Sequence, residues 1–214
     1  MSKSDGEQMP AATLVKTEDR RITRTKQALR HALIELMEER GLENFTVNDL
    51  CERADINRGT FYNHFHDKEG LLGALEDEFF SELECFQGRL GDMSMASIAK
   101  ASLLKKPLPL LVEFFDYLRG QSDFLHAVID AGGDASFSPR MRDSICTNLV
   151  RCMLHERYRD STDPFVGYYV AFFASAYMGV ISRWVETGMQ ESSEEMAVIA
   201  IRLLFIKPGE SIKL

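Results

Sequence analysis

The sequence has little of what marks a secreted, membrane-spanning or disulfide-stabilised protein. Its four cysteines form no CxxC pair, so we interpret them as free thiols in a reducing compartment. No uniformly apolar run reaches the roughly 18–20 residues that span a bilayer. The longest candidate, GYYVAFFASAYMGVISRW, holds small and polar residues, which favours a buried interface helix. The N-terminal residues lack the charged, apolar and small-residue succession of a signal peptide, so a cytoplasmic location is expected.

Sequence motifs of enzymes are also missing. There is no HExxH, GxSxG or GxxxxGK motif. The Glu-x-x-His pairs of di-iron helical bundles are absent as well, since the residues three positions before the five histidines are Ala28, Phe61, Asn63, Asp123 and Cys152. We therefore expect no enzyme, and the alternative is a helical-bundle enzyme or a ligand-binding protein without DNA function.

The segment HFHD could suggest metal ligands at His64, His66 and Asp67. Helix positions two apart do not face one point, so we expect no metal ion there. The other histidines stand alone and fit a surface or core position better than a ligand role. No cofactor is expected.

Acidic residues outnumber basic residues overall, but basic residues are concentrated near the N-terminus. The net charge is -8, which argues against an architectural protein that coats DNA. Nine lysines and arginines nevertheless fall between Arg20 and Lys68, and five of these lie between Arg20 and Arg30. A local basic edge on an acidic protein is compatible with DNA contact.

Apolar residues recur at helical spacing nearly throughout, and no segment alternates long enough to indicate a strand, so the pattern predicts an all-α fold. Gly41 is placed to end the first helix. Thr46 and Asp49 form a variant of the capping box, Asp55 tolerates a left-handed turn, and Asn57 is a good N-cap. The expected helices cover residues 23–40, 46–55, 58–65, 67–86, 107–118, 124–131, 138–158, 164–187 and 192–205.

The short second and third helices are joined by a tight turn and braced by longer helices, which is the spacing of a helix-turn-helix. The stretch NRGTFYNHFHDKEGLL suits the third helix of such a motif. Phe61 and Phe65, four residues apart, can dock on the supporting helices. The remaining side chains can then present donors to phosphates and base edges.

The stretch TVNDLCERADINRGTFYNHFHDKEGLL closely resembles the N-terminal domain of the TetR (tetracycline repressor) family of transcription regulators. The resemblance covers residues 20–80, with mild departures at Cys51, Asp55 and Asn57. It implies a tail at 1–19, a DNA-binding domain at 20–67 and a larger helical domain for effector binding and dimerisation at 68–214. It also implies phosphate contacts from Thr46, Tyr62, His64, Lys68 and Arg24, and base or groove contacts from Arg58, Gly59, Thr60 and Asn63.

The larger domain is rich in aromatic residues, and the segments DAGGDASF and GVISRWVETGMQESSEEMA resemble the C-terminal domain of one TetR subgroup. We expect an apolar effector cavity between helices. Its candidate wall comprises Phe114, Tyr117, Met141, Ile145, Tyr169, Phe172 and Tyr177. The acidic balance of the domain favours a neutral or cationic effector.

A stripe of small residues is expected to form the dimer interface, together with one face of the last helix. The candidates are Ala171, Ser175, Gly179, Met196, Ile199 and Leu203. The family resemblance then implies a homodimeric repressor that binds a palindromic double-stranded operator. A small-molecule effector would release it by changing the separation of its two reading helices.

Overall fold

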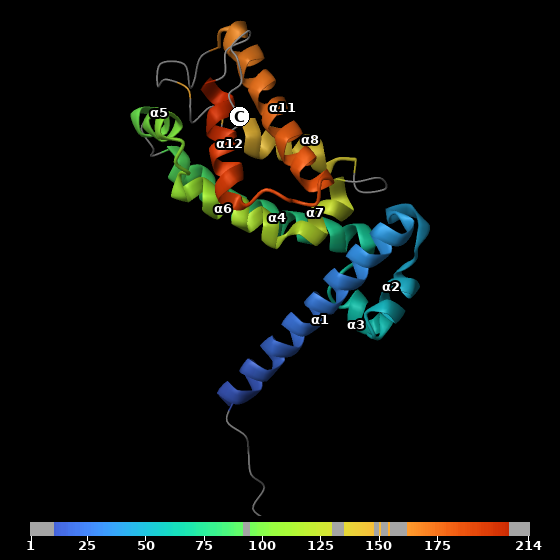
Figure 1. The fold of residues 1–214 in the computed structure, drawn as a ribbon. Coiled ribbons are helices and arrows are strands. Elements are labelled where there is room, and N and C mark those ends of the chain that lie inside the picture. Colours follow the sequence, from blue (N-terminus) through green and yellow to red (C-terminus); the bar gives the residue numbers. More distant parts are fainter. Residues whose placement is uncertain are drawn as a thin grey trace, which may run out of the picture. The chain divides into compact units, whose positions relative to one another are not determined.

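The computed structural model describes residues 11–91, 95–129, 135–147, 150, 154 and 162–205. Every regular element among these residues is helical, so the expected all-α fold is confirmed (Figure 1). The first elements are α1 (Ala11–Arg40), a 3₁₀ turn η1 (Leu42–Asn44), α2 (Val47–Arg53), α3 (Arg58–Tyr62) and α4 (Lys68–Gly91). Next come α5 (Met95–Leu104), α6 (Pro109–Gly120), α7 (Ser122–Ile129), α8 (Phe137–Met141), a π-helical turn η2 (Arg142–Cys146), α11 (Pro164–Glu186) and α12 (Ser193–Phe205).

The chain divides into two compact units, Met1–Leu72 and Gly73–Leu214. The division lies within α4, which begins in the first unit and continues into the second. The sequence placed the boundary slightly earlier, at the cap of this helix. One continuous helix therefore connects the two units along the chain.

The first unit is built around the buried side of α1. Leu29, Leu33 and Leu36 are almost fully buried, and Leu50 of α2 and Phe61 of α3 complete the same core. Gly41 adopts a left-handed φ of 73°, and its N–H donates to the carbonyl of Met37 at 2.8 Å. The predicted helix end is confirmed, because only glycine enters this conformation at little cost.

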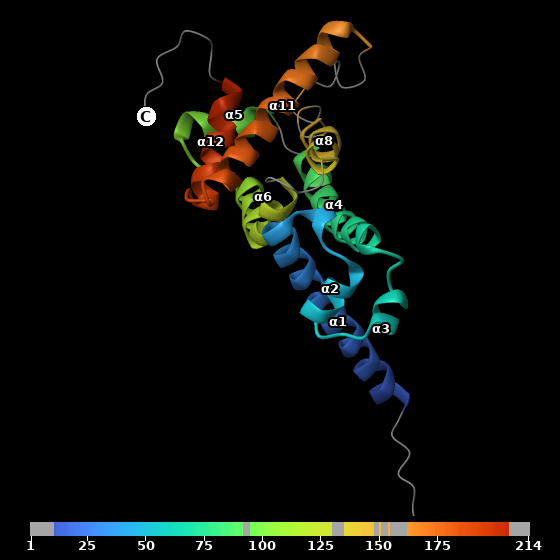
Figure 2. The same ribbon diagram turned by 90° about the vertical axis from the view of Figure 1, so that its right-hand side faces the viewer.

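In the second unit α12 packs against α5 and α6, while α11 contacts α7 and η2. Figure 2 shows α12 lying between α5 and α11. The turn before α12 is fixed by Arg119, whose guanidinium donates to the carbonyls of Met189 and Glu191 and lies 5.1 Å from the Trp184 ring. The predicted capping box of α12 is confirmed, since the Ser192 N–H donates to Glu195 at 2.7 Å and the Glu195 N–H donates to the Ser192 hydroxyl at 3.2 Å.

Several element bounds differ from the sequence expectation. α1 begins at Ala11 rather than near residue 23, and α3 ends at Tyr62 rather than at Phe65. α5 was not expected, because its short apolar stripe lies between two segments that we read as interruptions. The helix expected over 138–158 is represented by α8 and η2, and much of the remainder lies outside the described residues.

Among the described residues, one helix, α11, is long and apolar enough to cross a membrane. Only 22% of its most apolar window is buried within the chain. Phe165, Tyr168 and Phe172 are 72%, 77% and 69% exposed on this helix. The expected interface helix is therefore only partly covered within a single chain, and a large apolar face of α11 is left uncovered.

Candidate nucleic-acid interface

Thr46 and Asp49 fix the start of α2 by a reciprocal pair of hydrogen bonds. The Asp49 N–H donates to the Thr46 hydroxyl oxygen at 3.2 Å, and the Thr46 N–H donates to the Asp49 carboxylate at 2.8 Å. The Thr46 hydroxyl also donates to this carboxylate at 2.6 Å, and that bond is the main reason why the pKa of Asp49 is lowered. The capping box with aspartate in place of glutamate is confirmed.

The turn between α2 and α3 is tight and locally determined. Asp55 adopts the left-handed conformation, with φ of 52°, and the Ile56 N–H donates back to the carbonyl of Cys51 at 3.0 Å. Asn57 then caps α3, because its side-chain oxygen accepts from the Gly59 N–H at 2.8 Å. A side chain at Gly59 would meet this same oxygen at 3.3 Å. The predicted turn and cap are both confirmed.

α3 has one buried side and one exposed side. Phe61 is fully buried, and its ring lies 5.9 Å from that of Phe65. Arg58, Asn63 and His64 are exposed, Tyr62 is 50% exposed, and Thr60 is half-buried. The Arg58 guanidinium lies 5.9 Å from the centre of the Tyr62 ring. In α3 and the residues directly after it, the buried aromatic residue Phe61 and the exposed polar side chains are thus separated, as the sequence predicted.

The ammonium of Lys68, at the first position of α4, is bonded within the protein and is not open to solvent as a free phosphate-binding lysine would be. Its ammonium donates to the carbonyls of Leu42 at 2.6 Å and Phe45 at 2.9 Å. It also lies 4.9 Å from the Phe45 ring, and the side chain is only 13% exposed. Lys68 therefore ties η1 and the start of α2 to α4, a role that helical spacing alone did not indicate.

Arg53 forms a second tie within this unit. Its guanidinium pairs with Glu39 at 2.8 Å and with Glu35 at 3.1 Å, which fastens α2 to α1. The hydrogen bond from Arg53 lowers the pKa of Glu39, and the two carboxylates raise the pKa of Arg53. Sequence reasoning counted Arg53 only as one of the local bases. The i, i+4 spacing of Glu35 and Glu39 was the signal that could have indicated a partner.

The described free cysteines are Cys51 and Cys85. Cys51 is buried in the first unit, and burial raises the pKa of its thiol. Cys85 is exposed. The side chains of Cys146 and Cys152 lie outside the described part of the chain.

The candidate effector residues of the second unit fall into separate environments. Phe114 and Met141 are buried, and Tyr117 donates from its hydroxyl to the Phe79 carbonyl at 3.3 Å. Tyr169 and Phe172 are 38% and 69% exposed on α11. The remaining two are Tyr177, whose hydroxyl donates to the Ala200 carbonyl at 3.0 Å, and Ile145, whose side chain lies outside the described part.

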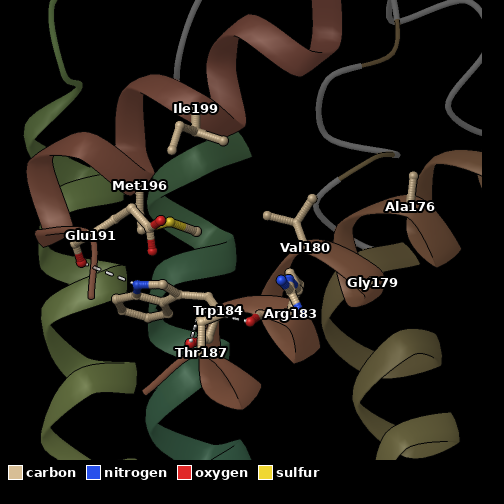
Figure 3. Close-up of a pocket in the computed structure, with 9 residues that line it drawn as sticks. All are labelled: Ala176, Gly179, Val180, Arg183, Trp184, Thr187, Glu191, Met196 and Ile199. Atoms are coloured by element: carbon tan, nitrogen blue, oxygen red, sulfur yellow. Dashed lines mark hydrogen bonds between the residues drawn. The ribbon is translucent and has the colours of Figure 1, made fainter. Parts of the chain in front are cut away.

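Two hollows open on the described surface of the second unit. The larger, of about 460 Å³, lies between α11 and α12 (Figure 3). It is lined by Ala176, Gly179, Val180, Arg183, Trp184, Thr187, Glu191, Met196 and Ile199. The second, of about 350 Å³, is lined by Pro107, Glu191, Glu194, Glu195, Val198, Ile199 and Arg202. These two linings include none of the seven candidate effector residues.

The candidate dimer residues lie largely on the surface of α11 and α12. Ala171, Ser175 and Gly179 are exposed, Leu203 is 39% exposed and Ile199 is half-buried, whereas Met196 is buried. Gly179, Met196 and Ile199 also line the larger hollow (Figure 3). The stripe of small residues is therefore open on the side of α11 that bears this hollow.

Two family models match the chain. Residues 29–75 match the bacterial regulatory proteins of the tetR family, and residues 105–205 match a transcriptional regulator C-terminal region. The first match contains all of α2 and α3. The second extends from the end of α5 to the end of α12.

Curated relatives match over short segments. An uncharacterised HTH-type transcriptional regulator YxbF of Bacillus subtilis is 33% identical over 66 residues, which are 30% of this chain and 17% of that protein. The HTH-type transcriptional repressor DhaR of Mycobacterium sp. is 44% identical over 46 residues, 22% of this chain and 23% of the relative. The dhaKLM operon transcriptional activator DhaS of Lactococcus lactis is 34% identical over 59 residues, 28% and 32% of the two chains. The chain thus spans less than a third of the length of each of these relatives.

Two solved structures have a similar fold over most of their length. A dihydroxyacetone kinase operon activator DhaS matches with a TM-score of 0.52 and 21% identity, covering 84% of this chain and 93% of that one. A TetR transcriptional regulator from Streptococcus agalactiae matches with a TM-score of 0.55 and 23% identity, covering 89% and 98%. At this level of identity the similarity establishes the fold.

Proposed function

The chain belongs to the TetR family of helix-turn-helix transcription regulators, and we propose that it is a cytoplasmic homodimeric repressor released from its operator by a small molecule. The observation that carries the proposal is the two-sided α3. Phe61 anchors α3 on the core of the first unit. Arg58 and Tyr62 lie together on its exposed side, near other polar donors. Such a helix suits the major groove of a duplex.

The proposed DNA contacts follow from position and chemistry. Arg58, Gly59, Thr60 and Asn63 lie at the first turn and the end of α3, where they would meet base edges. Tyr62, His64 and Thr46 would donate to phosphates, Arg24 would add a contact from α1, and Lys68 would act at the N-terminus of α4. At Lys68 the backbone N–H groups of that first turn are the better donors, because its ammonium already binds two carbonyls.

The proposed dimer uses the open face of α11 together with α12. An exposed apolar patch commonly marks a protein interface, and Phe165, Tyr168 and Phe172 are among the most exposed large apolar residues of the described chain. Two α11–α12 pairs related by a two-fold axis would form a four-helix interface in which the same surface is used by both subunits. Such a dimer would bring two α3 helices to half-sites about 34–36 Å apart on a palindromic operator.

The proposed effector is apolar and neutral or cationic, and we assign it to the aromatic cluster beside α4. The ring centroids of Phe114 and Tyr117 of α6 lie 5.8 and 6.0 Å from the centroid of the Phe86 ring. The centroids of the Tyr117 and Phe79 rings are 5.7 Å apart. Met141 is buried in the same unit. A molecule that separates these rings would displace α4, which continues into the DNA-binding unit. The size of the shift between the two positions of α4 would be set by the difference between the affinities of the molecule for them.

Repression is the simpler outcome of operator binding, because a bound dimer blocks a promoter without any further partner. The names of the relatives include both a repressor and an activator. A reporter gene placed behind the operator distinguishes the two, since deletion of this chain should raise expression if it represses. Lower expression after deletion would make it an activator.

The experiment that tests the function is selection of duplexes from a random DNA library by the wild-type chain, followed by titration of the selected duplex. A palindrome with half-sites about one helical turn apart is expected. Failure to enrich any sequence, with binding no tighter than to random DNA, would contradict the proposal. The matched control is Arg58→Ala, which should retain phosphate contacts but enrich a less defined sequence.

A further inference from the structure

The exposed face of α11 changes character halfway along the helix. Its first half carries four exposed aromatic residues, which are Phe165, Tyr168, Tyr169 and Phe172. Its second half carries four residues that line the larger hollow, which are Ala176, Gly179, Val180 and Arg183 (Figure 3). We call the first set the aromatic quartet and the second set the hollow quartet. Bulky side chains and a recess thus occur on the same helix.

The two quartets also lie on the same side of α11. Both repeat at i, i+3, i+4 and i+7, and each member of the hollow quartet follows a member of the aromatic quartet by eleven residues. Eleven residues are close to three full turns of about 3.6 residues, and they rise about 16.5 Å. The opposite side of the helix bears the buried Val170, Ala174 and Met178. The aromatic quartet therefore cannot reach the hollow of its own chain.

The spacing i, i+3, i+4, i+7 is the same when it is read backwards. If a second α11 lies antiparallel, with a two-fold axis at the level of Ala174, each aromatic residue comes opposite one member of the partner's hollow quartet. The facing pairs are Phe165 with Arg183, Tyr168 with Val180, Tyr169 with Gly179, and Phe172 with Ala176. Ala174 lies close to the centre of α11 (Pro164–Glu186), so the two helices would overlap over nearly their whole length.

We propose that the aromatic quartet of one subunit fills the hollow between α11 and α12 of its partner, in an antiparallel pair of α11 helices, which rests on the homodimer proposed above. Large residues that face small ones interdigitate, as Tyr169 would against the partner's Gly179. The Arg183 side chain is 74% exposed and would meet the ring of the partner's Phe165, a favourable cation–π pairing. A parallel pair would instead set aromatic residues against each other and leave both hollows open.

Disulfide cross-linking of the full chain tests the direction of the pair. Tyr168→Cys and Val180→Cys are made as separate chains, each with Cys85→Ser to remove the exposed native thiol. The two chains are mixed under reducing conditions, allowed to exchange subunits and then oxidised. A cross-linked dimer is expected in the mixture, because the two positions face each other. The Cys85→Ser chain without a new cysteine gives the baseline.

Neither cysteine chain should cross-link when it is oxidised alone. In the antiparallel pair each of these positions lies about 18 Å along the helix axis from its own copy, whereas a disulfide requires Cα atoms within about 7 Å. Cross-links in both separate chains and none in the mixture would indicate a parallel pair. That result would overturn the inference and leave the homodimer standing. A dimer without cross-links above the baseline in any sample would place the interface elsewhere and would also overturn it.

Truncation of the aromatic quartet tests its contribution to the dimer. Phe165→Ala combined with Phe172→Ala should raise the dimer dissociation constant at least about 100-fold, because burial of each phenylalanine is worth about tenfold or more. The control, Leu103→Ala with Leu104→Ala, removes two exposed leucines of α5 and should leave the dissociation constant unchanged. Sedimentation over a range of concentrations measures both. An unchanged constant in the phenylalanine variant would contradict the filled hollow.

The wild type is measured first, because a monomer at micromolar concentration would remove the proposed homodimer itself. In that case flotation with phosphatidylcholine vesicles examines the other surface that could cover α11, since this helix is long and apolar enough to cross a membrane. A monomer that floats with the vesicles would assign the aromatic quartet to lipid. Either result overturns the inference, and neither affects DNA binding by α3.

Discussion

Arg53 and Arg58 stand five positions apart and have different surroundings. Arg53 is held by Glu35 and Glu39 on α1, whereas Arg58 is exposed over the Tyr62 ring. A guanidinium that already binds two carboxylates has few N–H donors left for a contact with DNA. An exposed guanidinium at the start of α3 can bind guanine bidentately. The two arginines therefore form a natural pair of test and control.

Arg58→Ala is expected to relax base preference at one position of each half-site by about 1–3 kcal/mol, or about 5- to 150-fold. Arg53→Ala should lower the melting temperature, because α2 loses its tie to α1, and should leave the base preference unchanged. Titration of duplexes altered one base pair at a time measures the first effect, and thermal unfolding the second. Loss of base preference in Arg53→Ala with a normal melting temperature would reverse the assignment.

Lys68→Ala is expected to lower the free energy of unfolding by about 1–3 kcal/mol, because the carbonyls of Leu42 and Phe45 lose a charged donor. If the ammonium also reaches a phosphate in the complex, the salt slope should fall by about one. Urea denaturation and a salt titration separate the two roles. Unchanged unfolding would contradict the tie, and an unchanged slope would contradict the phosphate contact.

At the scale of elements, the parts that the sequence predicted well are those governed by neighbouring residues. Gly41, Asp55 and Asn57 act within one turn of their own positions, and each adopts the expected conformation. The wall of the effector cavity depends instead on which side of α11 faces inward. Apolar residues such as Val170, Phe172 and Tyr169 occur all around that helix, so their spacing did not distinguish the buried Val170 from the exposed Phe172.

α5 escaped prediction for a related reason. Among the described side chains of this helix, Ile98 and Ala101 are the two that join the core that Leu108 and Ile201 complete. Two buried positions do not define a periodic pattern, and α12 supplies the rest of the packing from about a hundred residues later in the chain. The start of α1 was missed because the first nineteen residues are polar and mixed, so their sequence shows no periodic apolar pattern.

α8 is held to α4 by Arg140, and this contact is open to a quantitative test. Its guanidinium binds Glu76 at 3.0 Å and Asp77 at 2.5 Å, and it lies 4.4 Å from the Phe80 ring. The Glu76 side chain is only 5% exposed. A buried carboxylate that loses its cation is costly, typically by about 3–5 kcal/mol.

Arg140→Met is expected to lower the free energy of unfolding by about 2–3 kcal/mol, less than for a fully buried pair because the guanidinium is 41% exposed. Glu76→Gln added to this variant should recover a large part of the loss, since no buried charge then remains. Asp77→Asn serves as the control, because the Asp77 side chain is 72% exposed and should contribute little. Urea denaturation of the four proteins measures the coupling, and an equal loss in Asp77→Asn would contradict the importance of Glu76.

At the scale of the whole molecule, the uncovered face of α11 is the strongest reason to expect a dimer. Gly179 lies on this face, and a β-carbon added there would meet nothing within 4 Å in the single chain. A larger residue at this position therefore fits the monomer, and its helix propensity would favour α11 by about 1 kcal/mol. A loss of dimerisation or of DNA affinity in a folded variant would then point to a contact with another molecule.

Gly179→Leu is accordingly expected to remain folded, to sediment as a monomer at micromolar concentration and to lose at least about 100-fold in operator affinity, because two tethered half-site contacts become independent. Gly88→Leu is the matched control. Gly88 is an exposed glycine of α4 where an added β-carbon also meets nothing within 4 Å, and it lies outside the proposed interface. It should therefore sediment and bind as the wild type does.

Sedimentation velocity measures the oligomeric state, and gel-shift titration measures the operator affinity. A wild-type monomer at these concentrations would contradict the dimer, and a dimeric Gly179→Leu with full affinity would move the interface away from the stripe of small residues on α11.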